Sequence, residues 1–264
     1  MKKKNNTGFI FVHLILAVFL LASLLCSFQI WIAQYERQVK KSLKIFEKKI
    51  HHRSLIYRAM ALLSKADVSK KIEDVSESSI HLQWEDESEK FDLKELNHPD
   101  QDQREQYSRW IEKLFKKLQI PSSKIHAIFE EIHSHENLES LEEIPSLRTL
   151  MKEKDLDLSA YLTVYSQGGK ININTAPKLV LEVLLEDEDP FLVERVLKKR
   201  RSGISPYHST EELSGLSTSV LKWLTFKGSY FRIRIFDQNF KEPRMDVVLE
   251  RAFGTVKVRQ WIEK

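Results

Sequence analysis

The sequence is poor in cysteine and glycine, and this scarcity removes several classes of binding site. Cys26 is the only cysteine among 264 residues, so neither an intramolecular disulfide nor a zinc site built from cysteines is possible. The seven glycines form no G-x-G-x-x-G and no G-x-x-x-x-G-K motif. The phosphate-binding loops of dinucleotide-binding and P-loop proteins are therefore excluded.

Charged residues are missing from a long stretch near the N-terminus. No Asp, Glu, Lys or Arg lies between Asn5 and Tyr35, and the run from Phe9 to Ala33 is almost wholly apolar. About 20 apolar residues are enough to cross a bilayer as a helix. We therefore expect residues 9–33 to span a membrane.

Helix-breaking residues are also scarce in the first part of the chain. Proline does not occur before Pro99, and no glycine lies between Gly8 and Gly168. A stripe of apolar residues at helical spacing follows the membrane segment: Val39, Leu43, Phe46, Ile50, Tyr57 and Met60. The pattern predicts either an amphipathic helix packed on its own domain or one continuous helix from Phe9 to about Ala66, with its second half against a globular head.

The positive charge is concentrated near the membrane segment. Of 42 basic and 38 acidic residues, three lysines precede the apolar run, and residues 36–58 hold eight basic and two acidic residues. Residues 59–264 are left with 31 basic and 36 acidic side chains. A folded part with net negative charge disfavours nucleic-acid binding, which needs a basic patch on that part.

The remainder alternates between strand and helix patterns. Residues 80–84 and 91–93 alternate as strands, and residues 231–235, 245–249 and 256–258 predict an antiparallel meander. Helical faces are expected within these segments: 107–118, 125–132, 145–151, 179–184, 192–197 and 213–224. Asn174 or Thr175 is expected to cap the helix that begins after Pro177.

The first residues resemble a known export leader. Lys-Lys-Lys-Asn-Asn-Thr-Gly8-Phe9 resembles the leader of pilins and pseudopilins, which prepilin peptidase cuts after Gly on the cytoplasmic side. This resemblance implies cleavage between Gly8 and Phe9, with the N-terminus in the cytoplasm. An ordinary signal anchor is the alternative, and the basic residues after the apolar run would by themselves keep the body in the cytoplasm.

A motif in the second half carries a more specific resemblance. The residues Asn172, Asn174, Thr175, Ala176 and Pro177 belong to the run Ile-Asn-Ile-Asn-Thr-Ala-Pro, and the segment Tyr-His-Ser-Thr-Glu-Glu-Leu lies at 207–213. Together they resemble the helix-hairpin-helix-like region of the type II secretion system minor pseudopilin K family, also called general secretion pathway protein K. The family typically lacks the Glu that most pilins carry at the fifth mature position, where this chain has His13.

The resemblance implies an α+β fold with a pilin-like long N-terminal helix, a small antiparallel sheet and an inserted all-α domain. The inserted domain would contain the helix-hairpin-helix-like unit. The expected parts are a leader at 1–8, a transmembrane part at 9–33, an amphipathic part at 34–66, a sheet core at 67–98 and 226–264, and an insert at 99–225, with the helix-hairpin-helix-like unit at 170–225.

The resemblance also implies a function, a location and partners. The chain would be a structural minor pseudopilin at the tip of the pseudopilus, supporting protein export across the outer membrane. It would cross the bacterial inner membrane once, with its body in the periplasm. Implied partners are other minor pseudopilins, prepilin peptidase, the inner-membrane secretion machinery and the lipid bilayer. No cofactor is implied, and residues 129–136 lack the family's Trp-x-Asp-x-Asp segment, so no metal site is expected.

Two other functions are weaker alternatives. A membrane-anchored DNA receptor of natural transformation shares the run Ile-Asn-Ile-Asn-Thr-Ala at 171–176, and the basic run 198–201 could contact phosphates. However, the hairpin 185–190 has four acidic residues and no glycine, and would repel DNA. Catalysis is not expected either, because His126, Glu130, His133 and His135 form no H-E-x-x-H motif.

Overall fold

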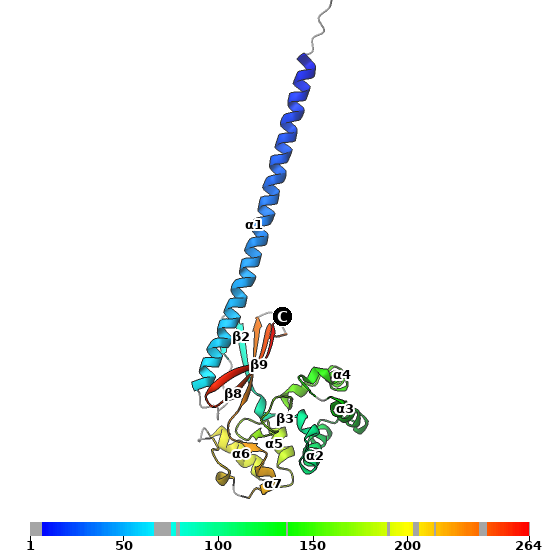
Figure 1. Ribbon diagram of the computed structural model, residues 1–264, viewed down its shortest axis with the longest axis vertical. Coiled ribbons are helices and arrows are strands. Elements are labelled where there is room, and N and C mark those ends of the chain that lie inside the picture. The colour runs from blue at the N-terminus through cyan, green and yellow to red at the C-terminus, as the bar shows by residue number, and fades with distance from the viewer. Residues whose placement is uncertain are drawn as a thin grey trace, which may run out of the picture. The chain divides into compact units, whose positions relative to one another are not determined.

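The protein is described by a computed structural model that divides into two units (Figure 1). The structure describes residues 7–65, 75–77, 80–135, 137–188, 191–202, 206–213, 215–237 and 242–263, without the side chains of 7–10 and 75–77. The first six leader residues therefore lie outside the described part. The units are Met1–Leu55 and Ile56–Lys264. We call residues 7–55 the shaft and the described residues from Ile56 onward the body.

A single helix, α1, runs from Thr7 to Lys65. Its 59 residues correspond to about 88 Å at 1.5 Å per residue. This confirms the expected continuous helix, which ends one residue earlier than expected. The absence of proline and of glycine after Gly8 explains the continuity, because each would weaken or kink a helix interior.

The body contains an antiparallel sheet of five strands in the order β1-β2-β7-β8-β9. Their bounds are Val75–Glu77 for β1, Ile80–Asp86 for β2, Tyr230–Asp237 for β7, Met245–Ala252 for β8 and Thr255–Glu263 for β9. The predicted C-terminal meander is confirmed by β7, β8 and β9. Strand β2 pairs along its whole length with residues 231–237 of β7, although most of the body lies between the two strands in sequence.

The two faces of this sheet differ in chemistry. Period-two alternation places Trp84, Ile233 and Val247 on one buried face, and the Arg232 and Arg234 side chains on the other. At the end of α1, Ile56, Ala59 and Leu63 are also buried. Since neither these residues nor the apolar sheet face belong to the core of the helical part, we infer that they bury each other.

The helical part lies between β2 and β7 in the sequence. Its α-helices are α2 (Gln101–Lys117), α3 (Ser122–Ser134), α4 (Pro145–Lys154), α5 (Lys178–Leu184), α6 (Leu192–Arg201) and α7 (Thr218–Leu221). Its 3-10 turns are η1 (Glu87–Glu89), η2 (Leu93–Asn97), η3 (Leu141–Glu143), η4 (Leu158–Ala160) and η5 (Thr210–Glu212). Its short strands are β3 (Phe91–Asp92), β4 (Leu162–Thr163), β5 (Ile171–Asn172) and β6 (Leu224–Thr225).

The core of the helical part is a cluster of aromatic side chains surrounded by aliphatic ones. The rings of Tyr107 and Trp223 lie 5.3 Å apart between centroids, and those of Trp110 and Trp223 lie 5.7 Å apart, edge to face. Phe91 completes the cluster at 5.7 Å from Tyr107. These rings hold α2 against the segments that enter and leave the insert, because Phe91 precedes α2 and Trp223 follows α7.

The structure refines the composition of the predicted parts. Residues 67–98 were expected in the sheet core, yet within this segment Phe91 and Asp92 pair in parallel with Leu162 and Thr163 instead of joining the main sheet. The insert was expected to be all-α, yet it contains the short strands β4, β5 and β6, of which β4 pairs with β3 and β5 pairs with β6. The long helix, small antiparallel sheet and additional helices of the predicted fold class are confirmed, while the domain boundaries stay predictions.

Candidate functional site

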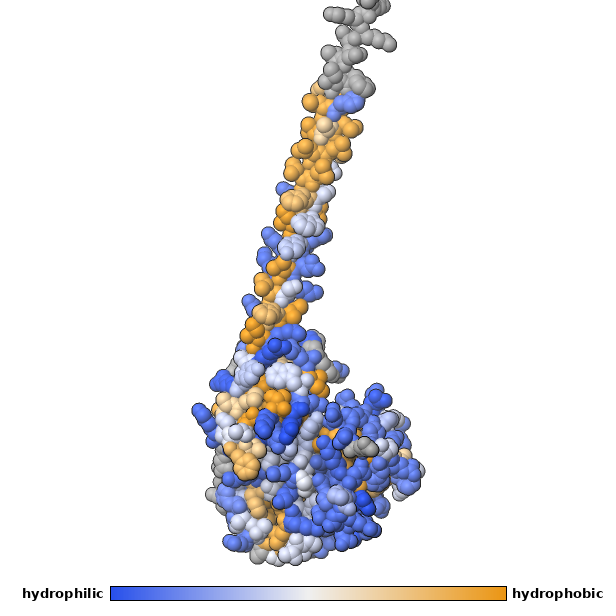
Figure 2. Space-filling view, viewed as in Figure 1, coloured by the Kyte–Doolittle hydropathy of each residue, from blue (hydrophilic) through white to orange (hydrophobic). Residues whose placement is uncertain are grey.

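The shaft exposes a long apolar surface. Every side chain from Phe11 to His51 is exposed, including His13, and large residues such as Phe19 and Leu24 are 74% and 70% exposed. Figure 2 shows this surface as an almost unbroken hydrophobic band over the first part of the shaft. Among the described residues, α1 is the one helix long and apolar enough to cross a membrane.

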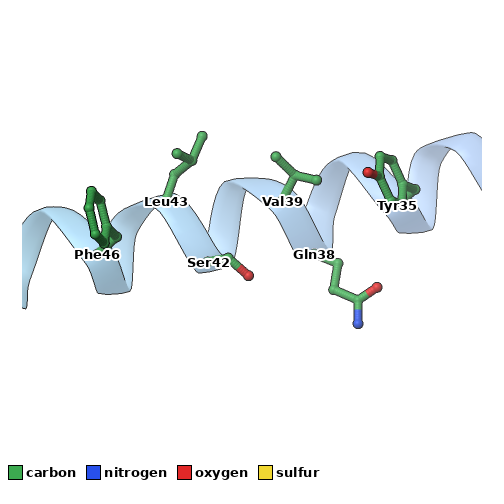
Figure 3. A pocket seen from close by; sticks show the side chains of 6 residues that line it. All are labelled: Tyr35, Gln38, Val39, Ser42, Leu43 and Phe46. Carbon is green, nitrogen blue, oxygen red and sulfur yellow. The ribbon is translucent and has the colours of Figure 1, made fainter.

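A second apolar feature continues along the shaft beyond the expected membrane segment. We call Tyr35, Val39, Leu43, Phe46 and Ile50 the apolar stripe; all are exposed. The first four line a groove along the helix together with Gln38 and Ser42, and Figure 3 shows the four on one side of the helix and Gln38 and Ser42 on the other. Their positions fall within about 80° of one another around the helix axis at 3.6 residues per turn.

The part of α1 that belongs to the body has one buried and one exposed side. Ile56, Ala59 and Leu63 lie on the buried side. Tyr57, which continues the stripe into the body, is 64% exposed. The packing of the stripe against the globular head stays a prediction.

The run 171–177, which we call the motif, forms a buried junction with the end of β2. The Asn172 side chain is fully buried and donates from Nδ2 to Asp86 Oδ2 at 2.8 Å. The hydroxyl of Thr175 donates to the same oxygen at 3.0 Å, and the backbone N–H of Ser88 donates to Oδ1 at 2.9 Å. The motif therefore ties the helical part to the last residue of a central strand.

The buried carboxyl group of Asp86 lies close to the backbone of Gly228. Burial raises the pKa of Asp86 above its usual value and outweighs the hydrogen bonds from Asn172, Thr175 and Ser88, which lower it. A Cβ at Gly228 would lie 2.6 and 2.7 Å from the two carboxylate oxygens of Asp86. Glycine is therefore required where the chain leaves the helical part beside this carboxylate.

Asn174 joins two further segments. Its Nδ2 donates to the carbonyls of Tyr207 and Phe226, at 2.9 and 3.0 Å, and its Oδ1 accepts from the Tyr207 N–H at 2.8 Å. Helix α5 begins after Pro177 without any side-chain cap, so the expectation that Asn174 or Thr175 caps it is wrong. Both side chains instead bind segments that are distant in sequence.

Arg200 closes the same junction from α6. Its guanidinium donates to the carbonyls of Ala176, at 2.6 Å, and Ile173. Burial lowers the pKa of Arg200 to about 10. This member of the basic run 198–201 is thus engaged by the motif, and Lys199 pairs with Glu212 at 2.8 Å.

The acidic hairpin between α5 and α6 is bound to α2. Lys113 contacts Glu186 and Asp187 at 3.2 and 2.9 Å, and Lys117 contacts Glu186 at 3.3 Å. Glu188 accepts hydrogen bonds from the N–H and the hydroxyl of Ser217. The fourth acid of the predicted hairpin, Asp189, lies outside the described residues.

A buried ionic network on the polar face of the sheet was not predicted. Lys90 and Glu87 are each only 1% exposed and lie 3.0 Å apart, and Lys90 also contacts Glu85 at 2.7 Å. Arg232 bridges Glu87 and Asp246 at 2.8 and 3.1 Å, and Arg234 contacts Glu85 at 2.5 Å. Because strand residues alternate, the pattern Phe-Arg-Ile-Arg-Ile at 231–235 could have placed both arginines on one face.

The network fixes the charge states of its members. Burial alone would raise the pKa of Glu87, but the charges of Lys90 and Arg232 outweigh it and lower this pKa to about 2. Burial alone would lower the pKa of Lys90, but Glu87 and Glu85 raise it instead. The hydroxyl of Thr163, in β4, also donates to Glu87, and the contact of Arg232 with Glu87 links the sheet to the helical part.

The histidine cluster considered for catalysis does not assemble. His126 contacts Glu130 at 3.2 Å on the surface of α3, whereas His133 Nδ1 lies 2.8 Å from Asn97 Oδ1. His135 Nδ1 lies 2.8 Å from the carbonyl of Glu131. Within the described residues, no group of three or more His, Cys, Asp or Glu side chains is arranged to hold a metal ion.

Comparison with known proteins supports the fold. No protein-family model matches the sequence, and no curated protein matches it. The structure is similar to a chain in the crystal structure of the GspK-GspI-GspJ complex from the type 2 secretion system of enterotoxigenic Escherichia coli. The TM-score is 0.61 at 13% identity, over 86% of this chain and 99% of that one. This likeness shows a pilin-like fold of the kind found among pseudopilins.

Proposed function

We propose that this chain is a structural minor pseudopilin of a type II secretion pseudopilus and supports protein export across the bacterial outer membrane. The observation that carries the proposal is the likeness of its fold to a chain of the GspK-GspI-GspJ complex over 86% of its length. The membrane-length apolar surface of the shaft agrees with it. The role is structural rather than enzymatic, because the polar side chains of the motif hold the body together.

The proposed topology follows from the leader. Prepilin peptidase would cut between Gly8 and Phe9 in the cytoplasm, and residues 9–33 would cross the inner membrane once. The body would lie in the periplasm and join the inner-membrane secretion machinery and the growing pseudopilus. The backbone of Gly8 and Phe9 lies in α1, as a continuous anchor helix requires.

The apolar stripe supplies a surface for assembly with other minor pseudopilins. It is exposed, and its continuation into the body at Tyr57 is exposed as well. An unburied apolar stripe at helical spacing fits the helix of another membrane-anchored subunit, because both would exclude water along their length. We therefore propose other minor pseudopilins as direct partners.

We further propose a position at the tip of the fibre. His13 replaces the Glu that, according to the family resemblance, meets the terminal amine of the subunit above in most pilins. A subunit with none above it does not need that pairing. The helical part inserted between β2 and β7 enlarges the body, which suits a terminal position better than a stacked one.

The alternative of a DNA receptor is less well supported by the geometry. DNA-binding hairpins present backbone amides to phosphate. Here the hairpin presents Glu186 and Asp187, which α2 holds in place through Lys113. Arg200 faces two backbone carbonyls of the motif rather than solvent. We therefore propose no nucleic-acid partner.

Leader processing tests the proposed class of protein. In a bacterium with a type II secretion system, the mature protein should begin at Phe9, and Gly8→Val should leave a precursor longer by eight residues. Asn6→Gln, which alters the leader but keeps Gly8, should be cut normally. Intact mass and N-terminal sequencing of the membrane fraction distinguish these forms. A mature wild-type protein that still begins before Gly8 would refute the leader.

Fibre labelling tests the proposed position. A fluorophore on the body should mark one end of an isolated pseudopilus, with a single labelled site per fibre. The same label on a major subunit should mark the whole length and serves as the control. Labels of this chain distributed along the shaft of the fibre would contradict the tip position, although not the pseudopilin class.

A further inference from the structure

The shaft carries a basic ridge on the side away from its apolar stripe. We define the ridge as Arg37, Lys40, Lys41 and Lys44, all of which are exposed. At 100° per residue these four positions fall within about 100° of one another, and their centre lies about 150° from that of the apolar stripe. Glu36, which contacts Lys40 at 3.8 Å, lies at the border between the two faces.

The ridge begins close to the expected end of the membrane segment. Arg37, Lys40 and Lys41 lie about 6–12 Å along the helix axis from Ala33 at 1.5 Å per residue. Trp31 and Tyr35 mark the same level, since their exposed rings stack 5.9 Å apart between centroids and such rings favour the membrane interface. Long basic side chains at this height reach back to the headgroups.

A second basic group occurs farther along the helix. Lys48, Lys49 and Arg53 lie about 22–30 Å from Ala33 by the same rise per residue. The Debye length is about 8–10 Å at ordinary ionic strength. The field of an anionic membrane surface therefore acts strongly on the first group and weakly on the second.

We propose that Arg37, Lys40 and Lys41 bind the headgroups of anionic phospholipids in the leaflet from which the shaft emerges. The continuity of the ridge with the membrane segment favours a lipid over an acidic protein, because a protein surface would engage both basic groups. The contact fixes the depth of the helix in the membrane. This inference depends on the membrane anchor and not on the identity of the fibre.

The test compares two triple variants with the same loss of charge. The full chain is reconstituted in phosphatidylcholine nanodiscs containing traces of nitroxide-labelled phosphatidylglycerol or phosphatidylcholine. Electron spin resonance then gives the relative association of the two lipids with the protein. The proximal variant is Arg37→Gln, Lys40→Gln, Lys41→Gln, and the distal variant is Lys48→Gln, Lys49→Gln, Arg53→Gln.

The wild-type chain should prefer phosphatidylglycerol by about fivefold, the effect of one basic side chain held near an anionic surface. The proximal variant should lose most of this preference, and the distal variant should keep it. Salt at 0.5 M should weaken it in the wild type. The leader lysines are common to all three proteins and do not affect the comparison.

Three results would overturn the proposal: no lipid preference in the wild type, equal losses in both variants, or a preference that salt does not change. Equal losses would indicate a diffuse charge effect or an acidic protein partner. Circular dichroism should show the same helix content in both variants, so that lost binding is not lost folding.

Discussion

The shaft and the body both depart from the usual distribution of side chains. The shaft exposes apolar side chains, and the body buries charged ones. In the shaft, Phe19 and Leu24 are 74% and 70% exposed, whereas in the body the charged side chains of Glu87 and Lys90 are 1% exposed. Exposed apolar surface of this extent requires lipid or another chain to cover it. Buried charges require partners within the fold. The apolar side chains of the shaft thus need lipid or another chain to cover them, whereas the buried charges of the body find their partners within the fold.

The largest loss of stability is expected from the removal of one buried charge in the body. Lys90→Met removes the buried cation that contacts both Glu87 and Glu85, and should lower the free energy of unfolding by about 3–5 kcal/mol. Lys124→Met, which removes an exposed pair with Glu153, should cost about 0–1 kcal/mol. Urea unfolding of the full chain in detergent, followed by tryptophan fluorescence, measures both. Equal losses of unfolding free energy in the two variants would mean that the buried network stabilises the fold no more than the exposed pair does.

Acid should weaken the same network. The pKa of Glu87 is lowered from 4.5 to about 2 in the folded chain, so its contribution is present above pH 4.5 and is lost as the pH falls through 2. The shift corresponds to about 3 kcal/mol. The stability difference between the wild type and Glu87→Gln should therefore shrink by about this amount between pH 6 and pH 2. Glu153→Gln, at an exposed pair, should keep the wild-type profile, and a constant difference for Glu87→Gln would contradict the prediction.

The motif junction should give an intermediate effect. Asn172→Ala removes a donor to the buried carboxyl group of Asp86 and should lower the free energy of unfolding by about 1–3 kcal/mol. Ser159→Ala, which removes an exposed hydrogen bond to Asp157, should change it by less than about 0.5 kcal/mol. The same urea titration compares them. An Asn172→Ala variant as stable as the wild type would show that the motif serves something other than the fold.

The smallest effect on stability is expected in the shaft. Val39→Ser with Phe46→Ser changes only exposed positions, and should alter the unfolding of the body by less than about 0.5 kcal/mol. The same variant should lose co-purification with partner minor pseudopilins from membranes. Gln38→Ser with Lys44→Ser, away from the stripe, should keep it. Retained partners in the stripe variant would remove the stripe from the proposed assembly surface.

Local sequence patterns were sufficient for the elements but not for their contacts. The absence of breakers predicts α1, and period-two alternation predicts β7, β8 and β9. Which face of α1 is buried within the body could not be predicted, because Ile56 and Leu63 lie on one apolar side of the helix and Tyr57 lies on another. Only the position of the sheet in space decides between two such faces.

The partners of the site residues could not be predicted from local sequence either. Asn174 and Thr175 are ordinary cap residues by local rules, and the prediction of a cap failed because acceptors distant in sequence compete for them. Thr175 binds Asp86, 89 positions earlier, and Glu87 binds Arg232, 145 positions later. Pairings over such distances follow from the tertiary fold and leave no local signal.

The pairing of β2 with β7 has a consequence for the architecture of the body. Asp86 and Phe231 are partners in the ladder, so the chain leaves and re-enters the sheet at two points about 5 Å apart. The helical part is therefore connected to the sheet by two neighbouring chain segments, and a short turn between Asp86 and Phe231 could replace it without moving any strand. The five-stranded sheet can keep its register while the helical part changes in length, so the sequences of the two parts can diverge at different rates.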